Sequence, residues 1–173
     1  MITRYLTRAH DTLTWLSAAA GGVFLFTATA MYVYEVAVRY FFNAPTVWTS
    51  DWTSYFLAVV IFTLIPELAR SHGHISIELV PEALSPGLRR VLETATMLAA
   101  AGVCIFSAWV ALGQTQSLYA SGVVTIASAP TPKWWIMAVI AYGFFNAGLH
   151  FLRHGATRLQ GKPLQQPNPE QQA

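Results

Sequence analysis

The chain has 173 residues, of which 54% are hydrophobic and only 10% are charged, whereas a typical soluble domain has about 25% charged residues. A water-soluble globule of this composition would lack the polar surface to cover itself, so the composition excludes a soluble domain. The formal net charge of only +2 gives no indication of a nucleic-acid partner. We expect an all-α membrane protein with one four-helix domain over residues 1–160 and a disordered cytoplasmic tail over 161–173.

Four apolar segments are each long enough to cross the ~30 Å hydrocarbon core of a bilayer. They cover approximately residues 13–42, 49–69, 86–119 and 132–154. The first follows Arg4 and Arg8 and superficially resembles a signal peptide, but its apolar run is too long for one. We therefore expect an uncleaved first transmembrane helix, capped by Asp11 or Thr12.

The passage between the first two spans is polar, aromatic and rich in turn residues. Glu35 and Arg39 are four residues apart on one helix face, in the order that favours an ion pair. Asn43–Pro45 predicts a turn, because proline disfavours helix at the residue before it and asparagine can bond the turn backbone. Trp48 and Trp52 follow at the interfacial depth that indole rings prefer. The pattern predicts a helical hairpin with its ion pair at the outer boundary.

Two features of the later spans predict where helices bend or pack. Pro66 in the second span removes a backbone hydrogen bond, which indicates a bend near Phe62. Gly143 and Ala147 in the fourth span have the spacing of small residues that let another helix approach closely in lipid. The sequence alone leaves open whether that helix belongs to this chain or to a partner.

The cations predict the orientation. Those at the N-terminus, between the second and third spans and at the C-terminus are Arg4, Arg8, Arg70, Arg89, Arg90, Arg153, Arg158 and Lys162, whereas Lys133 alone lies between the third and fourth spans. By the positive-inside rule both termini and the middle loop are cytoplasmic. Within that loop, apolar and polar residues alternate from Ile75 to Leu79, which predicts an amphipathic segment along the membrane surface.

The predicted spans carry few polar or charged residues near the middle of the membrane. A protein that moves solutes by itself needs polar groups or broken helices near the midplane, whereas the charged residues here cluster at span ends. Glu67, three residues before Arg70, is better explained by an interfacial ion pair than by a functional buried acid. Thr27, Thr29 or Ser107 could line only a small path. The pattern favours a scaffold for another subunit, with a small independent exporter as an alternative.

Histidines raise the question of a cofactor. His72, His74, His150 and His154 lie on the predicted cytoplasmic side, and a b-type cytochrome would need two of its histidines facing each other inside the bundle. Ordinary interfacial histidines fit better, and the cytochrome remains an alternative. His72 and His74 with Glu78 match no strong zinc signature. With no hydrolase or nucleotide motif either, we expect no cofactor, no metal and no enzymatic activity.

One set of residues resembles a known family when taken in chain order. The set comprises Glu35, Arg39, Tyr40, Phe42, Asn43, Trp48, Asp51, Arg70, Gly73, His74, Ile75 and Glu78, and later Pro132, Trp134, Trp135, Gly143 and Phe144. In this order and spacing the chain resembles the small membrane subunit, of the DctQ type, of tripartite ATP-independent periplasmic (TRAP) transporters. The likeness covers roughly residues 13–155.

The resemblance implies a bacterial inner-membrane protein with two protein partners, a large membrane transport subunit and a periplasmic substrate-binding protein. It implies import of organic acids driven by an ion gradient, usually of sodium, with the small subunit bracing the large one and helping the binding protein to dock. On this basis Glu35, Arg39 and Asp51 fix the hairpin or its contact with the large subunit. The remaining candidate interface or structural residues are Tyr40, Asn43, Trp48, Trp52, His74 and Glu78.

Overall fold

The computed structural model describes residues 2–71, 86–126, 128 and 130–159. Within these residues the chain forms four helices: α1 (Ile2–Phe42), α2 (Trp48–Ser71), α3 (Pro86–Ser121) and α4 (Lys133–Leu159). Each is long and apolar enough to cross a membrane, which confirms the prediction of an all-α protein with four helices of membrane-spanning length. The predicted amphipathic segment of the middle loop, with His74 and Glu78, and the tail of residues 161–173 lie outside the described residues.

The predicted start of the first helix is wrong, because α1 begins at Ile2 and not near residue 13. Neither expected cap acts as one. The Thr12 hydroxyl donates to the carbonyl of Arg8 inside the helix, and Asp11 is ion-paired with Arg153 of α4. With 41 residues, α1 is about 60 Å long at 1.5 Å per residue. That is roughly twice the hydrocarbon thickness, so its polar first turns extend beyond the apolar layer.

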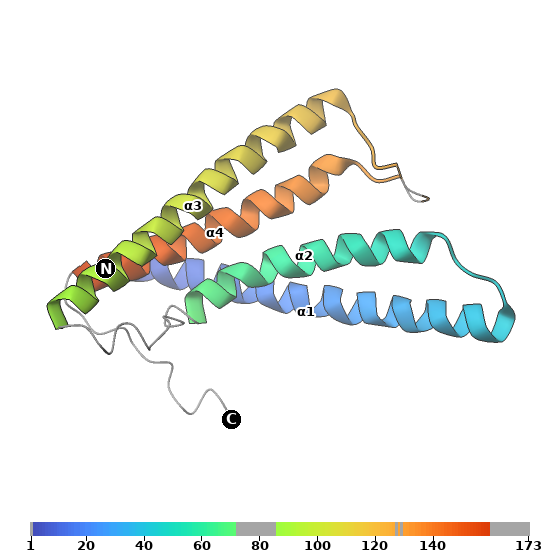
Figure 1. Ribbon diagram of the computed structural model, residues 1–173, viewed down its shortest axis with the longest axis horizontal. Helices are drawn as coiled ribbons and strands as arrows, with labels where there is room; N and C mark the ends of the chain where they lie inside the picture. Colours follow the sequence, from blue (N-terminus) through green and yellow to red (C-terminus); the bar gives the residue numbers. More distant parts are fainter. Residues whose placement is uncertain (1, 72–85, 127, 129, 160–173) are drawn as a thin grey trace.

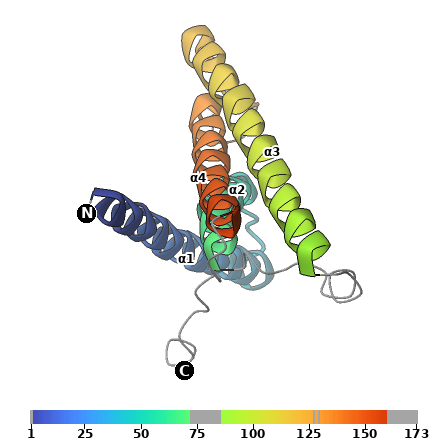
Figure 2. The same cartoon turned by 90° about the vertical axis from the view of Figure 1, so that its left-hand side faces the viewer.

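The helices are arranged as two hairpins that diverge from one end. Figure 1 shows four helix ends gathered at the left: the start of α1, the end of α2, the start of α3 and the end of α4. From there the hairpins spread apart toward the α1–α2 and α3–α4 connections, which we call the outer connections. Seen from that end, α2 and α4 lie between α1 and α3 (Figure 2). The packed helix pairs are α1 with α2, α2 with α4 and α3 with α4. The contact between α2 and α4 therefore joins the two hairpins.

Glycines lie where these helices touch. At Gly143 in α4, a Cβ atom would collide with the carbonyl group of Phe62 in α2. That carbonyl has no helical donor four residues on, because Pro66 carries no N–H. Ala147, one turn after Gly143, is fully buried. Both residues thus lie inside this bundle, and Gly143 packs against α2. The other glycines at helix contacts are Gly21, Gly148 and Gly155.

Candidate functional site

Glu35 joins the outer end of α1 to the loop that precedes α2. The residue is only 7% exposed, and its Oε1 accepts from Nη2 of Arg39 at 2.6 Å and from Nε at 3.2 Å. Its Oε2 accepts from the backbone N–H of Thr46 at 3.0 Å and from the Thr46 hydroxyl. The predicted ion pair is confirmed. The bonds to Thr46 were not predicted, because Thr46 lies in an irregular loop where no spacing rule applies.

The turn predicted at Asn43–Pro45 is also confirmed. Helix α1 ends at Phe42 and α2 begins at Trp48. Asn43 has a φ of 50°, a left-handed conformation that asparagine adopts more readily than most residues and that commonly ends helices. The geometry at Asn43 thus brings the Thr46 backbone within reach of the Glu35 carboxylate.

Asp51 fastens the second outer connection to α2. Its Oδ2 accepts from the backbone N–H of Ser128 at 2.9 Å. One turn further along α2, the Tyr55 hydroxyl donates to Oγ1 of Thr125 at 2.8 Å. Figure 1 shows this connection beside the first turns of α2. Asp51, predicted to fix the hairpin or a partner contact, therefore holds the α3–α4 connection in place.

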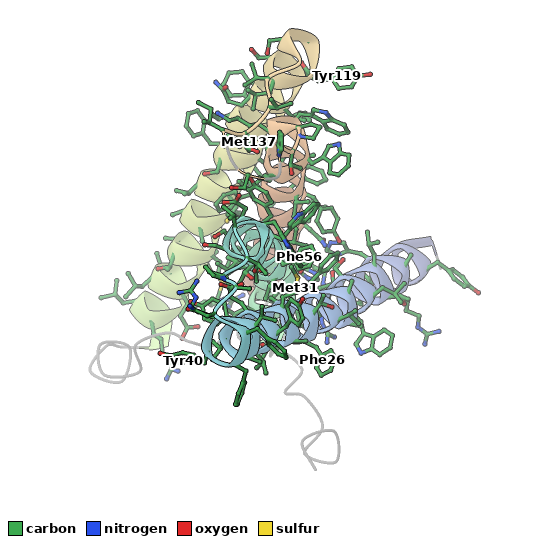
Figure 3. All side chains as sticks on the ribbon, turned by 90° about the vertical axis from the view of Figure 1, so that its right-hand side faces the viewer. Phe26, Met31, Tyr40, Phe56, Tyr119 and Met137 are labelled. Atoms are coloured by element: carbon green, nitrogen blue, oxygen red, sulfur yellow. The ribbon has the colours of Figure 1, made fainter. Side chains whose placement is uncertain are left out.

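The aromatic candidates at the outer end divide into packed and projecting side chains. Trp52 packs on Phe56, with ring centroids 5.8 Å apart. Trp48 is 43% exposed and Tyr40 is 81% exposed, and Tyr40 points away from the bundle in Figure 3. An apolar, partly aromatic surface therefore remains open beside Glu35.

We expect Asp51→Ala to loosen the α3–α4 connection without unfolding the helices. The substitution removes the acceptor for the Ser128 N–H and leaves the bond between Tyr55 and Thr125, so the cost should be at most about 1.5 kcal/mol. Hydrogen exchange should speed up for peptides that contain Ser128 and stay unchanged in α2. Ser50→Ala is a matched control at a neighbouring exposed position. Unchanged exchange at Ser128 in Asp51→Ala would contradict this role.

A second polar site lies near the opposite end, between α1 and α4. We call it the α1–α4 polar cluster, and it consists of His10, Asp11, Thr14 and Ser17 from α1 and Tyr142, Asn146, His150 and Arg153 from α4. Oγ1 of Thr14 and Nε2 of His150 are 2.9 Å apart. Nδ2 of Asn146 donates to the Tyr142 hydroxyl at 3.2 Å. Short contacts also link His10 with Asn146 and Ser17 with Tyr142.

The cluster also contains an ion pair and a pair of stacked imidazole rings. Arg153 donates from Nη1 to Oδ1 of Asp11 at 2.7 Å and from Nη2 to Oδ2 at 3.3 Å. The His10 and His150 rings stack with centroids 4.1 Å apart. His150 is fully buried. Because buried polar groups are costly without partners, these contacts specify how the start of α1 docks on α4.

The sequence prediction missed this cluster, since it considered charged residues at span ends and, within the spans, only Thr27, Thr29 and Ser107, whereas Asn146 lies midway along α4. A signal was nevertheless present. His10, Thr14 and Ser17 are four and three residues apart, the spacing of one helix face. Along α4, Tyr142, Asn146, His150 and Arg153 follow the same rule. Two polar stripes on otherwise apolar helices indicate that the helices face each other, and the contacts of Thr14 with His150 and of Ser17 with Tyr142 confirm that they do.

The stacked imidazoles also bear on the cytochrome alternative. Axial histidines bind a haem from opposite faces, with their nitrogen-bearing edges directed at the iron. Rings stacked at 4.1 Å with an interplanar angle of 28° leave no space for a macrocycle between them. The facing pair in this structure is therefore not arranged as haem ligands.

Comparison with known proteins identifies one family. The family model described as "Tripartite ATP-independent periplasmic transporters, DctQ component" matches residues 28–161 of this chain. No curated protein matches the chain. The matched range includes both outer connections and the whole α2–α4 contact.

Proposed function

This chain belongs to the DctQ component family of tripartite ATP-independent periplasmic transporters, and from that premise we propose that it is the non-catalytic small subunit that braces the large transport subunit. The proposal extends to a periplasmic substrate-binding protein that docks on the assembled membrane complex. It also extends to import of organic acids, such as dicarboxylates or sugar acids, driven by an ion gradient, usually of sodium. The family match is the observation that carries the proposal.

The open shape of the bundle supports a bracing role. Only 11% of the most apolar stretch of α1 is buried within the chain, and the most buried helix, α4, reaches 33%. Large apolar side chains such as Phe26, Tyr40 and Tyr119 project outward (Figure 3). Helices with this much free surface have room for both lipid and a second membrane protein, because association in lipid depends on packing between helix surfaces.

The distribution of charge supports an orientation with both termini in the cytoplasm of a bacterium and the chain in its inner membrane. Helix ends that gather at the left in Figure 1 carry Arg8, Arg70, Arg89, Arg90 and Arg153. The opposite ends carry Arg39, which is paired with Glu35, and Lys133. By the positive-inside rule the arginine-rich end faces the cytoplasm. The Asp51-anchored connection then faces the periplasm, where the substrate-binding protein docks.

Arg39 offers a test that separates a partner contact from a folding role. Its side chain is 59% exposed, and ion pairs this exposed contribute only about 0–1 kcal/mol. If Arg39 contacts the large subunit, Arg39→Ala should leave the isolated chain folded and reduce both co-purification with that subunit and organic-acid uptake, by about tenfold or more. Arg39→Lys should restore part of the loss, because it keeps the positive charge.

The control for this test is a cation at the opposite end, Arg8→Ala, which should leave assembly intact. Unchanged assembly and uptake in Arg39→Ala would remove Arg39 from the proposed subunit contact. A chain that co-purifies with no large membrane subunit at all would overturn the bracing function itself.

A further inference from the structure

We propose that the α1–α4 polar cluster is a binding site for a divalent transition-metal ion of the zinc type, with His10, Asp11 and His150 as ligands. Each of the three side chains offers one ligand atom, and these atoms lie within 4.8 Å of one another. Two imidazole nitrogens and a carboxylate oxygen suit Zn²⁺ and its neighbours Co²⁺ and Ni²⁺. They do not suit Mg²⁺ or Ca²⁺, which prefer oxygen ligands.

His150 supplies a second observation that points to a ligand. Its side chain is fully buried, and its Nε2 lies 2.9 Å from Oγ1 of Thr14. Its Nδ1 is buried as well and has no hydrogen-bond partner among the residues that the structure describes. Buried polar atoms in folded proteins are nearly always satisfied. An ion at this ring would supply an interaction that the surrounding side chains do not.

To close around an ion, the His10 and His150 rings, now stacked with an interplanar angle of 28°, must tilt so that their ligand nitrogens converge. Tetrahedral zinc with bonds of 2.0–2.2 Å holds its ligand atoms roughly 3.4 Å apart, so atoms now within 4.8 Å of one another must approach by up to about 1.4 Å. His10 and Asp11 are only half-buried, so they can shift with less loss of packing than the fully buried His150. A water molecule is available for the fourth position, because the Asn146 carboxamide is already engaged with His10 and Tyr142.

Arg153 fits the site as a positioning residue. It donates to both oxygens of Asp11, at 2.7 and 3.3 Å, and carboxylates that bind metals are commonly held by such outer hydrogen bonds. Its positive charge opposes that of the ion, so the affinity is lower than at a site with a neutral partner. A bound ion links the first turns of α1 to the end of α4, and it stabilises the folded chain in proportion to its occupancy.

The test uses the full-length chain in lipid nanodiscs, purified with a tag that contains no histidine and stripped of metal with EDTA. Titration with Co²⁺ should produce visible d–d absorption that saturates at one ion per chain, and Zn²⁺ should displace it and raise the melting temperature. His10→Gln and His150→Gln should weaken binding at least about tenfold. His154→Gln, one turn beyond the site on α4, should bind as the parent does.

Gel filtration and helical circular dichroism identify variants that fail to fold. Should His150→Gln aggregate, His10→Gln decides the question, because His10 is only half-buried and its replacement disturbs packing least. The proposal is overturned if the parent chain shows neither the absorption nor the thermal shift, or if folded His10→Gln binds Co²⁺ as tightly as the parent. These readouts need neither the large subunit nor transport, so they stand apart from the test of the subunit function.

Discussion

Replacing Gly143 by alanine should destabilise this bundle more than a similar change at any open glycine position. The added methyl group would occupy the space now filled by the Phe62 carbonyl, and it would also lie 3.0 Å from the Phe62 Cβ. A backbone carbonyl cannot rotate away as a side chain can, so α2 and α4 must separate. Overpacking of this kind costs about 1–3 kcal/mol, only partly offset by the gain of up to ~1 kcal/mol in helix propensity from glycine to alanine.

The position of this contact amplifies its effect. The α2–α4 contact joins the two hairpins, and so do the α1–α4 polar cluster and the bond of Asp51 to Ser128, so a displacement at Gly143 strains those links as well. Thermal unfolding followed by circular dichroism should show a midpoint several degrees lower for Gly143→Ala. Gly113→Ala, where a Cβ would meet nothing within 4 Å, is the matched control and should be neutral or slightly stabilising. Equal midpoints for the two variants would refute the close-packing explanation.

The contrast between Gly143 and Glu35 shows which parts of this structure the sequence could predict. The four helices, the turn at Asn43 and the ion pair of Glu35 with Arg39 all follow from rules that act over a few residues, such as apolar length, proline geometry and helical spacing. The pairing of Glu67 with Arg70, found at 2.5 Å, belongs to the same class. Local rules apply here because lipid demands continuous helices whatever the tertiary packing.

Contacts between distant segments were not predicted. The sequence marked Gly143 as a packing residue but could not name Phe62 as its neighbour, and it gave no reason to pair Asp51 with Ser128. The α1–α4 polar cluster connects residues more than 120 positions apart. Such pairs depend on which helix faces dock. Two polar stripes restrict that choice, but they do not determine it without the three-dimensional arrangement.

The early start of α1 has a related cause. The prediction starts the helix where the apolar run starts. A helix can nevertheless extend beyond that point into water, provided that its backbone groups are satisfied and its side chains are suitable. Residue type alone favours Asp11 as a cap. In the structure it lies inside the helix and pairs with Arg153 of α4. Residue type alone does not distinguish a cap from a side chain committed to another helix.

Glu35→Ala should produce the second large loss of stability, and the size of the loss depends on Thr46 more than on Arg39. Arg39 is 59% exposed, and an exposed ion pair adds little. The Glu35 carboxylate, in contrast, is almost fully buried and accepts two hydrogen bonds from Thr46. Removing it leaves the Thr46 N–H without its acceptor, which costs about 1–3 kcal/mol, and the connection from Asn43 to α2 loses its fixed geometry.

Two further variants separate the hydrogen bonds from the charge. Glu35→Gln keeps an oxygen that can accept from Thr46 but removes the negative charge, so the isolated chain should retain most of the stability lost in Glu35→Ala. Arg39→Ala, which keeps the acceptor and removes the cation, should cost less than about 1 kcal/mol. Thermal unfolding of the three purified variants measures this order. Suppose instead that Glu35→Gln and Arg39→Ala each lower the stability as much as Glu35→Ala does. The ion pair and not Thr46 would then hold the hairpin, because loss of the charge interaction is the one change that all three variants share.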